Sequence, residues 1–157
     1  MITCTFEKGY TDNLRHVVVH ALVVRNQEIL LEKRAGDLLE TGKWAIPGGF
    51  LSRDETVSQG VLRELYEETG WKGEIISLFR TNSNPKRAND ANRQNVIFEY
   101  LIKPIEKSGK TDWETSKVEW IPFDKLLPFD EFAFDHGESI RLLLSYLKKP
   151  FPLPVIM

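Results

Sequence analysis

The stretch that decides the fold covers residues 48–71 and reads GGFLSRDETVSQGVLRELYEETGW. Apolar residues recur every four positions in its second half, which predicts a helix with one buried face. The apolar stripe consists of Val57, Val61 and Leu65. Asp54 is a suitable N-terminal cap and Gly70 a suitable left-handed C-terminal cap, so we expect the helix to span about residues 55–69. Gly60 lowers helix stability and predicts a close approach by another part of the chain.

Several carboxylates lie within one turn of this helix. Glu64, Glu67 and Glu68 stand at positions i, i+3 and i+4, so their side chains share one face. Like charges this close repel one another, whereas a divalent cation offsets the repulsion, and Mg²⁺ prefers oxygen ligands. Glu55 lies near the start of the helix, and Arg63, one turn before Glu67, can hold that side chain in position. The alternative interpretation is a solvated acidic face, which is the usual setting of charge on a helix.

The spacing of these residues resembles the Nudix box of the Nudix hydrolase family. Gly49 is followed after five residues by Glu55, and after seven more by the run RELYEETGW at 63–71. The last position is usually aliphatic in the family and is Trp71 here, which is still bulky and apolar, so we expect it to pack. The resemblance covers about residues 14–147 and includes three further segments. They are WAIPGGF at 44–50, the expected closing strand within 118–127, and FDH at 134–136.

The resemblance implies an α/β fold, in which a mixed β-sheet is sandwiched between helices and the box forms a catalytic loop-helix-loop that holds Mg²⁺ or Mn²⁺. The metal ligands assigned by position are Glu64, Glu67, Glu68 and the backbone carbonyl of Gly48. Glu55 and Arg63 become supporting residues of the catalytic site. The general base stays open between Glu114, just ahead of the closing strand, and Glu64 or Glu67. The alternative for Glu114 is an ordinary loop carboxylate.

Members of the family mostly hydrolyse a nucleoside diphosphate linked to another moiety, so the resemblance implies an enzyme that acts on a nucleotide. Pro85 falls fifteen residues after Gly70, and SNPKR at 83–87 is similar to a Ser-Asp-Pro-x-Arg run of the ADP-ribose pyrophosphatase subgroup, with Asn84 in place of the acid. This similarity favours ADP-ribose as the substrate, with AMP and ribose 5-phosphate as products. One alternative is hydrolysis of modified nucleoside triphosphates with release of pyrophosphate, and another is a non-catalytic nucleotide sensor.

Cationic side chains near the box are candidates for binding the substrate phosphates, because a guanidinium group grips them in bidentate fashion. The candidates are Arg34, just before the box loop, and Arg87 and Arg93 in the polar loop after the box. Pro85 of that polar loop is a further candidate substrate residue. The alternative for each arginine is a solvated basic loop. Trp113 can stack on a base, but core packing is the commoner role of tryptophan. For His16, His20 and His136 we expect structural roles, the last at the start of a helix.

Further elements are expected on both sides of the box. The predicted strands cover 16–24, 28–33, 74–80, 95–103 and 118–121, and the first two form a hairpin. The last helix begins near Asp135, which has capping-box spacing with Glu138, and runs to about Leu147. The tail at 148–157 contains alternating prolines and is not helical. It can form contacts in a homodimer or cover its own domain, and both alternatives stay open.

Length, charge and cysteine content limit the classes of protein that remain. The 157 residues suit one domain over residues 1–157, with a core at 14–147 and the proline-rich tail at 148–157. With 21 basic and 23 acidic residues the chain has no broad basic surface, so we expect no nucleic-acid partner. Cys4 is the only cysteine, which excludes an intrachain disulfide. The longest apolar run, at 17–24, is too short to span a membrane, and the start of the chain lacks a secretion signal, so we expect a cytoplasmic protein.

Overall fold

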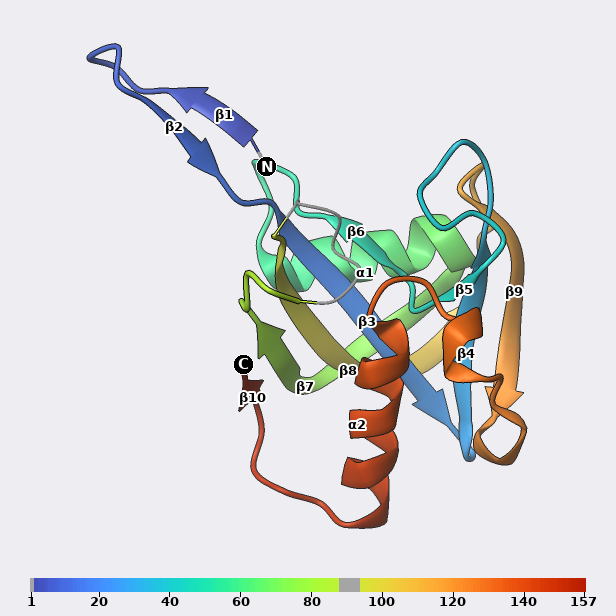
Figure 1. Cartoon of the computed structure of the whole chain (residues 1–157). Helices are drawn as coiled ribbons and strands as arrows, with labels where there is room; N and C mark the ends of the chain where they lie inside the picture. Colours follow the sequence, from blue (N-terminus) through green and yellow to red (C-terminus); the bar gives the residue numbers. More distant parts are fainter. Residues whose placement is uncertain (1, 88–93) are drawn as a thin grey trace.

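The computed structural model describes residues 2–87 and 94–157. Two helices cover opposite faces of a mixed β-sheet, with α1 behind the sheet and α2 in front of it in the view of Figure 1. Along the chain the elements are β1 (Ile2–Thr5), β2 (Thr11–Leu14), β3 (Val17–Arg25), β4 (Glu28–Arg34), β5 (Trp44–Ala45), β6 (Gly48–Phe50), α1 (Val57–Thr69), β7 (Trp71–Asn82), β8 (Val96–Lys107), β9 (Thr115–Pro122), the short 3₁₀ helices η1 (Phe123–Lys125) and η2 (Phe129–Glu131), α2 (His136–Lys148) and β10 (Val155–Ile156). The expected α/β sandwich is confirmed.

The central strand of the sheet is β3. The strand order is β10-β7-β8-β3-β4-β5, with β6 also paired to β3 and β9 to β4. The β3–β8 pair is parallel, whereas β7 pairs with β8, and β3 with β4, in antiparallel fashion. The turn between β3 and β4 falls at Asn26 and Gln27, which both adopt positive φ, as the predicted hairpin requires.

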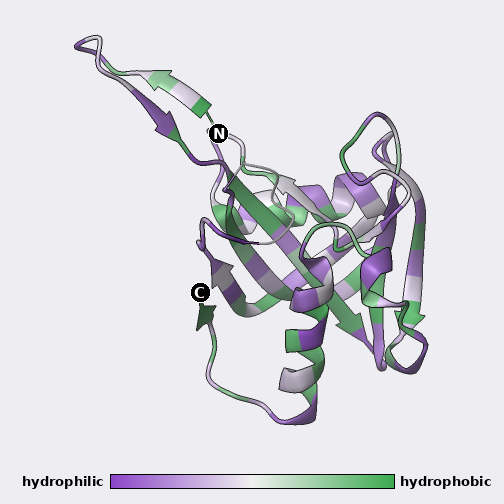
Figure 2. Cartoon of the chain, viewed as in Figure 1, coloured by the Kyte–Doolittle hydropathy of each residue, from purple (hydrophilic) through white to green (hydrophobic). Residues whose placement is uncertain are grey.

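Side chains of β3 alternate between two apolar cores, which explains why this strand is apolar almost throughout. The core on the α1 side includes Val19, Ala21, Val23, Val61 and Leu65. The core on the α2 side includes Leu22, Ile29, Leu31, Ile140 and Leu143. In Figure 2 both helices show hydrophobic bands interrupted by hydrophilic ones, as expected for helices with one buried face. The sheet therefore forms a layer between the helices, with an apolar core on each face.

The helix predicted within 48–71 is present, but its N-terminal cap differs from the prediction. Thr56, not Asp54, caps α1: its side chain accepts a hydrogen bond from the Gln59 backbone N–H, and the Gln59 side chain accepts one from the Thr56 N–H. This reciprocal pair satisfies two free backbone donors, which Asp54 does not. Gly70 ends the helix at φ 71°, as predicted. The close approach at Gly60 is also confirmed, because a Cβ there would lie 2.9 Å from Leu51 Cδ1.

The strands after α1 are longer than the predicted ones, because β7 and β8 form one long antiparallel ladder that continues beyond the apolar segments. The last helix starts where predicted, with Asp135 as its N-cap residue. The predicted capping box is wrong, since the Asp135 side chain makes no capping hydrogen bond. The carboxylate of Asp135 lies instead at a cavity described below.

Both ends of the chain add strands that the sequence patterns did not predict. β1 and β2 form a hairpin that stands away from the main body (Figure 1). The tail covers its own domain, which was one of the two alternatives: β10 pairs in parallel with β7, and the Met157 N–H donates to the Thr81 carbonyl at 2.9 Å. Phe151 of the tail packs edge-on against Tyr146 of α2. No helix in the described part of the chain is both long and apolar enough to cross a membrane.

Candidate active site

The two glycines of β6 let the chain before α1 pass close to β3 and to the helix. Gly48 pairs with His20 of β3, and a Cβ on Gly48 would collide with the Val19 carbonyl oxygen. A Cβ on Gly49 would lie 2.6 Å from Glu64 Oε1. The Gly-Gly pair therefore leaves room for the Glu64 carboxylate directly against the backbone of β6.

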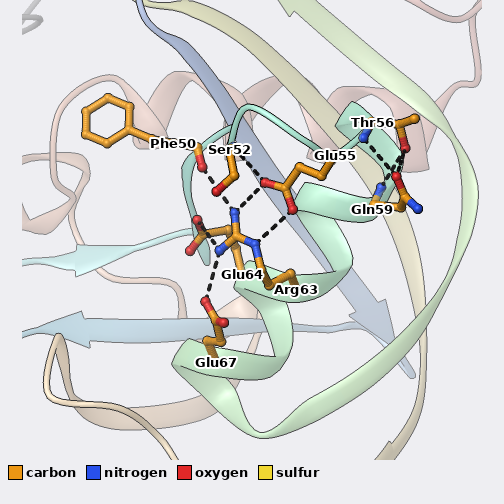
Figure 3. Close-up of polar contacts among 8 residues, drawn as sticks. All are labelled: Phe50, Ser52, Glu55, Thr56, Gln59, Arg63, Glu64 and Glu67. Atoms are coloured by element: carbon orange, nitrogen blue, oxygen red, sulfur yellow. Dashed lines mark hydrogen bonds and ion pairs between the residues drawn. The ribbon is translucent and has the colours of Figure 1, made fainter.

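Arg63 joins the loop before α1 to the acidic face of the helix (Figure 3). Its Nε and Nη2 donate to the two oxygens of Glu55 at 2.9 and 2.6 Å. Its Nη1 donates to Glu64 Oε1 at 2.8 Å and to Glu67 Oε2 at 2.9 Å, and Nη2 also reaches the Phe50 carbonyl at 3.1 Å. The expected contact of Arg63 with Glu67 is thus present, within a wider network that also fixes Glu55.

Arg63 shifts the pKa values of its carboxylate partners by different amounts. The hydrogen bond from Arg63 is the main reason that the pKa of Glu55 falls to about 2, and the Ser52 N–H adds to this effect by donating at 2.7 Å. The same bond, with those to Glu64 and Glu67, raises the pKa of Arg63 above its usual range. Burial raises the pKa of Glu64, although Arg63 opposes this shift. Arg63 therefore favours the charged form of Glu55 strongly, whereas at Glu64 the effect of burial is larger than that of Arg63.

Glu68 points away from this network and into the protein. Its Oε2 accepts a hydrogen bond from the Gly48 N–H at 2.6 Å. Burial, followed by the charge of Glu32 on β4, raises the pKa of Glu68 well above its usual range. Burial likewise raises the pKa of Glu32 to about 7, while its Oε2 accepts a hydrogen bond from the Thr115 hydroxyl at 2.8 Å. The two glutamates form a buried pair that links β4, β6 and α1.

The chemistry of these groups fits a divalent cation, because every candidate ligand is an oxygen, as Mg²⁺ prefers. Within residues 2–87 and 94–157, no three His, Cys, Asp or Glu side chains are arranged to hold a metal ion. The positive Nη1 of Arg63 lies between Glu64 and Glu67, and Glu68 is bonded to Gly48. The carboxylates of Glu64 and Glu67 thus converge on one cationic nitrogen, whereas that of Glu68 does not.

A cavity of about 480 Å³ opens beside the acidic helix. Its volume falls in the range of small-molecule binding sites. The described residues that line it are Val18, His20, Arg34, Asp37, Leu38, Leu39, Gly48, Gly49, Phe50, Glu64, Arg87, Asn95, Ile97, Glu114, Phe134, Asp135 and His136. Two of the predicted substrate residues, Arg34 and Arg87, are thus brought to the same cavity as Glu64. Pro85 lies in an exposed turn and is not among the lining residues, and Arg93 lies outside the described residues.

Glu114 shares the cavity with Glu64, as a candidate general base must. Burial raises the pKa of Glu114, and the negative charge of Asp112 raises it further. Arg34 opposes that shift, and its own Nε is held by the Leu39 carbonyl at 2.9 Å. Trp113 packs its ring over Gly36 and is largely exposed, and it is not among the residues that line the cavity.

A buried polar network lies beside His20, one of the residues that line the cavity. Arg80 of β7 donates through Nε and Nη2 to the two oxygens of Glu99 on β8, at 2.9 and 2.8 Å. The Ser139 hydroxyl of α2 donates to Glu99 Oε1 at 2.6 Å. Burial opposes ionisation of Glu99, but the neighbouring His20 and the charge of Arg80 outweigh it and lower the pKa of Glu99 to about 2. This network fixes the start of α2 relative to the sheet.

Three polar residues to which the sequence analysis gave structural or capping roles also line the cavity: His20, Asp135 and His136. The rings of the two histidines meet edge-to-face at 4.5 Å, and His136 Nδ1 accepts a hydrogen bond from the Ile46 N–H at 2.9 Å. Burial is the main reason that the pKa of His136 lies well below its usual range, so its ring is neutral and carries its proton on Nε2. For Asp135 and His136, the sequence signal was the FDH segment at 134–136, which directly precedes an apolar helix.

Known proteins resemble this chain over most of its length. Residues 14–143 match the family description "NUDIX domain". An ADP-ribose pyrophosphatase of Methanocaldococcus jannaschii is 30% identical over 125 residues, which cover 80% of this chain and 70% of that protein. Nucleoside triphosphatase NudI of an Enterobacter species is 30% identical over 139 residues, which cover 83% of this chain and 95% of that protein. The NUDIX domain of Shewanella oneidensis NrtR, solved in complex with ADP ribose, is 26% identical with a TM-score of 0.72, covering 90% of this chain and 93% of that one.

Proposed function

The chain belongs to the Nudix hydrolase family, and from this premise we propose that it hydrolyses ADP-ribose to AMP and ribose 5-phosphate. It is a Nudix pyrophosphohydrolase that acts on nucleotides. The choice of ADP-ribose as the substrate rests on two relatives. The Methanocaldococcus jannaschii protein is an ADP-ribose pyrophosphatase, and the Shewanella oneidensis domain was solved with ADP ribose. We further propose that residues 1–157 form one Nudix domain, with its core at 14–147 and its tail at 148–157.

The observation that carries the proposal is the convergence of Glu64 and Glu67 on one cationic nitrogen beside a cavity that also contains arginines. We propose that Glu64, Glu67 and Glu68, with the Gly48 carbonyl, hold Mg²⁺ or Mn²⁺. A bound divalent cation offsets the negative charge of the pyrophosphate and makes an attacking water more acidic. Arg63 holds Glu67 in place through the bond at 2.9 Å, and through Glu55 it fixes the loop ahead of the helix.

The remaining side chains of the proposed site bind the substrate and move a proton. Arg34 and Arg87 face the cavity and offset phosphate charge there. Arg93 and Pro85 belong to the same proposed substrate-binding loop. Glu114 is the proposed general base, because it lines the same cavity as Glu64 and burial raises its pKa, which makes the carboxylate a stronger proton acceptor. Glu64 or Glu67 is the alternative base. Phosphoryl transfer needs mainly positioning and electrostatic stabilisation, which such a set of groups supplies.

One relative favours a second candidate function. Nucleoside triphosphatase NudI matches this chain over almost its own full length, so hydrolysis of a nucleoside triphosphate with release of pyrophosphate is the alternative activity. The two reactions leave different products. Water added to ADP-ribose yields AMP and ribose 5-phosphate, whereas water added to a triphosphate yields a monophosphate and pyrophosphate.

The deciding experiment compares ADP-ribose, ATP and dGTP as substrates in Mg²⁺, with the products separated by ion-exchange chromatography. We expect the largest kcat/KM for ADP-ribose, with AMP and ribose 5-phosphate released in equal amounts. A larger kcat/KM for a triphosphate, with pyrophosphate as product, would replace the proposal by its alternative.

A further inference from the structure

Asp135 is the N-cap residue of α2, but its side chain does not cap the helix. An aspartate at this position ordinarily accepts a hydrogen bond from a backbone N–H of the first turn. Here the Asp135 side chain makes no such bond, and the N–H groups of Glu138 and Ser139 donate to the Asp135 backbone carbonyl instead, at 2.9 and 3.3 Å. The side chain is thus released from the capping role that its position offers.

The released carboxylate lines the cavity beside the acidic helix, although Asp135 is only 3% exposed. Two guanidinium groups face it at ion-pair distance: Arg80 Nη2 lies 3.6 Å from Oδ2, and Arg87 Nη1 lies 3.6 Å from Oδ1. Both distances exceed that of a hydrogen bond, and Oδ2 has no hydrogen-bond partner in the described part of the chain. A buried carboxylate oxygen without a hydrogen bond is costly, so Oδ2 of Asp135 needs an explanation.

The cavity itself supplies the explanation. Glu64, at the acidic helix, and Asp135, at the start of α2, line the same cavity, so a nucleotide with its pyrophosphate near Glu64 has room to reach Asp135 within this cavity. An ionised carboxylate only accepts hydrogen bonds, so it suits a group with O–H donors and repels a phosphate. Two neighbouring hydroxyls can bind the two oxygens of one carboxylate, and nucleotide-binding sites commonly use an acidic residue in this way on ribose.

We propose that the Asp135 carboxylate binds the vicinal hydroxyls of a ribose in the substrate. Burial raises the pKa of Asp135, and the charges of Arg87 and Arg80 oppose this shift and favour the ionised carboxylate. The Arg80–Glu99–Ser139 network holds the start of α2 in place. Asp135 thereby favours a hydroxylated group over a deoxygenated or phosphorylated one. The inference rests on the proposed function, because that function supplies a substrate with ribose. ADP-ribose contains two ribose groups, one in its adenosine half and one at its other end.

Binding measurements test this assignment independently of turnover. Isothermal titration calorimetry in Mg²⁺ would compare AMP with 2′-deoxy-AMP, and ribose 5-phosphate with 2-deoxyribose 5-phosphate. In the wild-type protein we expect one deoxy compound to bind about tenfold more weakly than its hydroxylated partner, the usual effect of losing a hydrogen bond to a charged group. The pair that shows the difference identifies which ribose Asp135 contacts.

The variants are Asp135→Ala, which removes the carboxylate, and Asp135→Asn, which keeps its shape if the alanine variant does not fold. The matched control is Glu138→Gln, which removes one exposed charge from the same turn of α2. We expect the preference for the hydroxylated compound to fall below twofold in the Asp135 variants and to persist in the control.

Wild-type protein that binds neither hydroxylated compound, or that shows no preference within either pair, would overturn the inference. So would Asp135 variants that fold and keep the preference. Failure of the proposed function gives a different result, namely no hydrolysis of ADP-ribose by the wild-type protein while the binding preference is present.

Discussion

Replacement of Arg63 by alanine tests whether this side chain holds the acidic helix and its preceding loop together. Arg63 makes five hydrogen bonds, four of them to carboxylate oxygens. A hydrogen bond to a charged group contributes about 1.5–3 kcal/mol when buried, but an exposed ion pair contributes only about 0–1 kcal/mol. The Arg63 side chain is 31% exposed and that of Glu67 is 50% exposed, so the bond to Glu67 adds little.

The contacts that remain are those with Glu55, Glu64 and the Phe50 carbonyl, all on the more buried side of Arg63. At about 1 kcal/mol for each partner, Arg63→Ala should lower the free energy of unfolding by about 3 kcal/mol. For a chain of this size that loss corresponds to a decrease in Tm of about 6–12 °C. Urea and thermal unfolding, followed by circular dichroism, measure both quantities.

The matched control is Arg53→Ala, since the Arg53 side chain is 90% exposed and pairs with Asp54 alone among the described residues. It should change the free energy of unfolding by less than about 0.5 kcal/mol. Excess Mg²⁺ should recover part of the loss in Arg63→Ala, because a cation between Glu64 and Glu67 replaces the missing positive charge. The reasoning is refuted if the two variants unfold within about 0.5 kcal/mol of each other.

Three other predictions concern single residues. Glu67→Gln should lower kcat by about 10²–10³-fold, measured with ADP-ribose in Mg²⁺, while the Tm stays within about 3 °C of the wild-type value. Gly49→Ala should lower kcat/KM by about 10²-fold with a loss of stability of about 1 kcal/mol, because its Cβ, 2.6 Å from Glu64 Oε1, displaces the carboxylate and weakens its bond to Arg63. Glu99 has a folded-state pKa of about 2, below its ordinary value, so it stabilises the fold above about pH 4.5 and this contribution is lost as the pH falls towards 2. Glu99→Gln should therefore reduce the slope of unfolding free energy against pH by up to about 1.4 kcal/mol per unit between pH 4.5 and 3.

Each of these predictions has a contrary outcome. Near-normal turnover by Glu67→Gln would remove this residue from the proposed metal ligands. Unchanged kcat/KM in Gly49→Ala would mean that the position of Glu64 does not matter for the reaction. An unchanged pH slope in Glu99→Gln would mean that Glu99 has the same pKa in the folded and unfolded chain.

Local patterns in the sequence were sufficient for the elements that carry the site. The apolar run that became β3, the β3–β4 hairpin and the Gly70 cap of α1 depend on residues close together in the chain, and all three were predicted. The hairpin of β1 and β2 was not predicted, because its strands are largely exposed and lack an apolar alternation. The N-cap of α1 was misplaced since Asp54 and Thr56 both suit that position.

The cavity and the buried groups beside it depend on contacts between distant parts of the chain. Glu32 meets Glu68, and His20 meets His136, only because the sheet places β4 and β3 beside the two helices. The pattern around Asp135 predicted a capping box, which is a local use of the carboxylate. The structure turns the same carboxylate towards a cavity, where no local signal distinguishes a cap from a binding group.

The most direct test of the central claim measures the initial rate of ADP-ribose hydrolysis by the wild-type protein and by Glu67→Gln as the Mg²⁺ concentration is raised. We expect a wild-type rate that rises with Mg²⁺ to a plateau, falls to background in EDTA and returns when Mg²⁺ is restored, with no comparable rate in Glu67→Gln. A wild-type rate that persists in EDTA, or equal rates in the two proteins at every Mg²⁺ concentration, would contradict a metal-dependent site on α1.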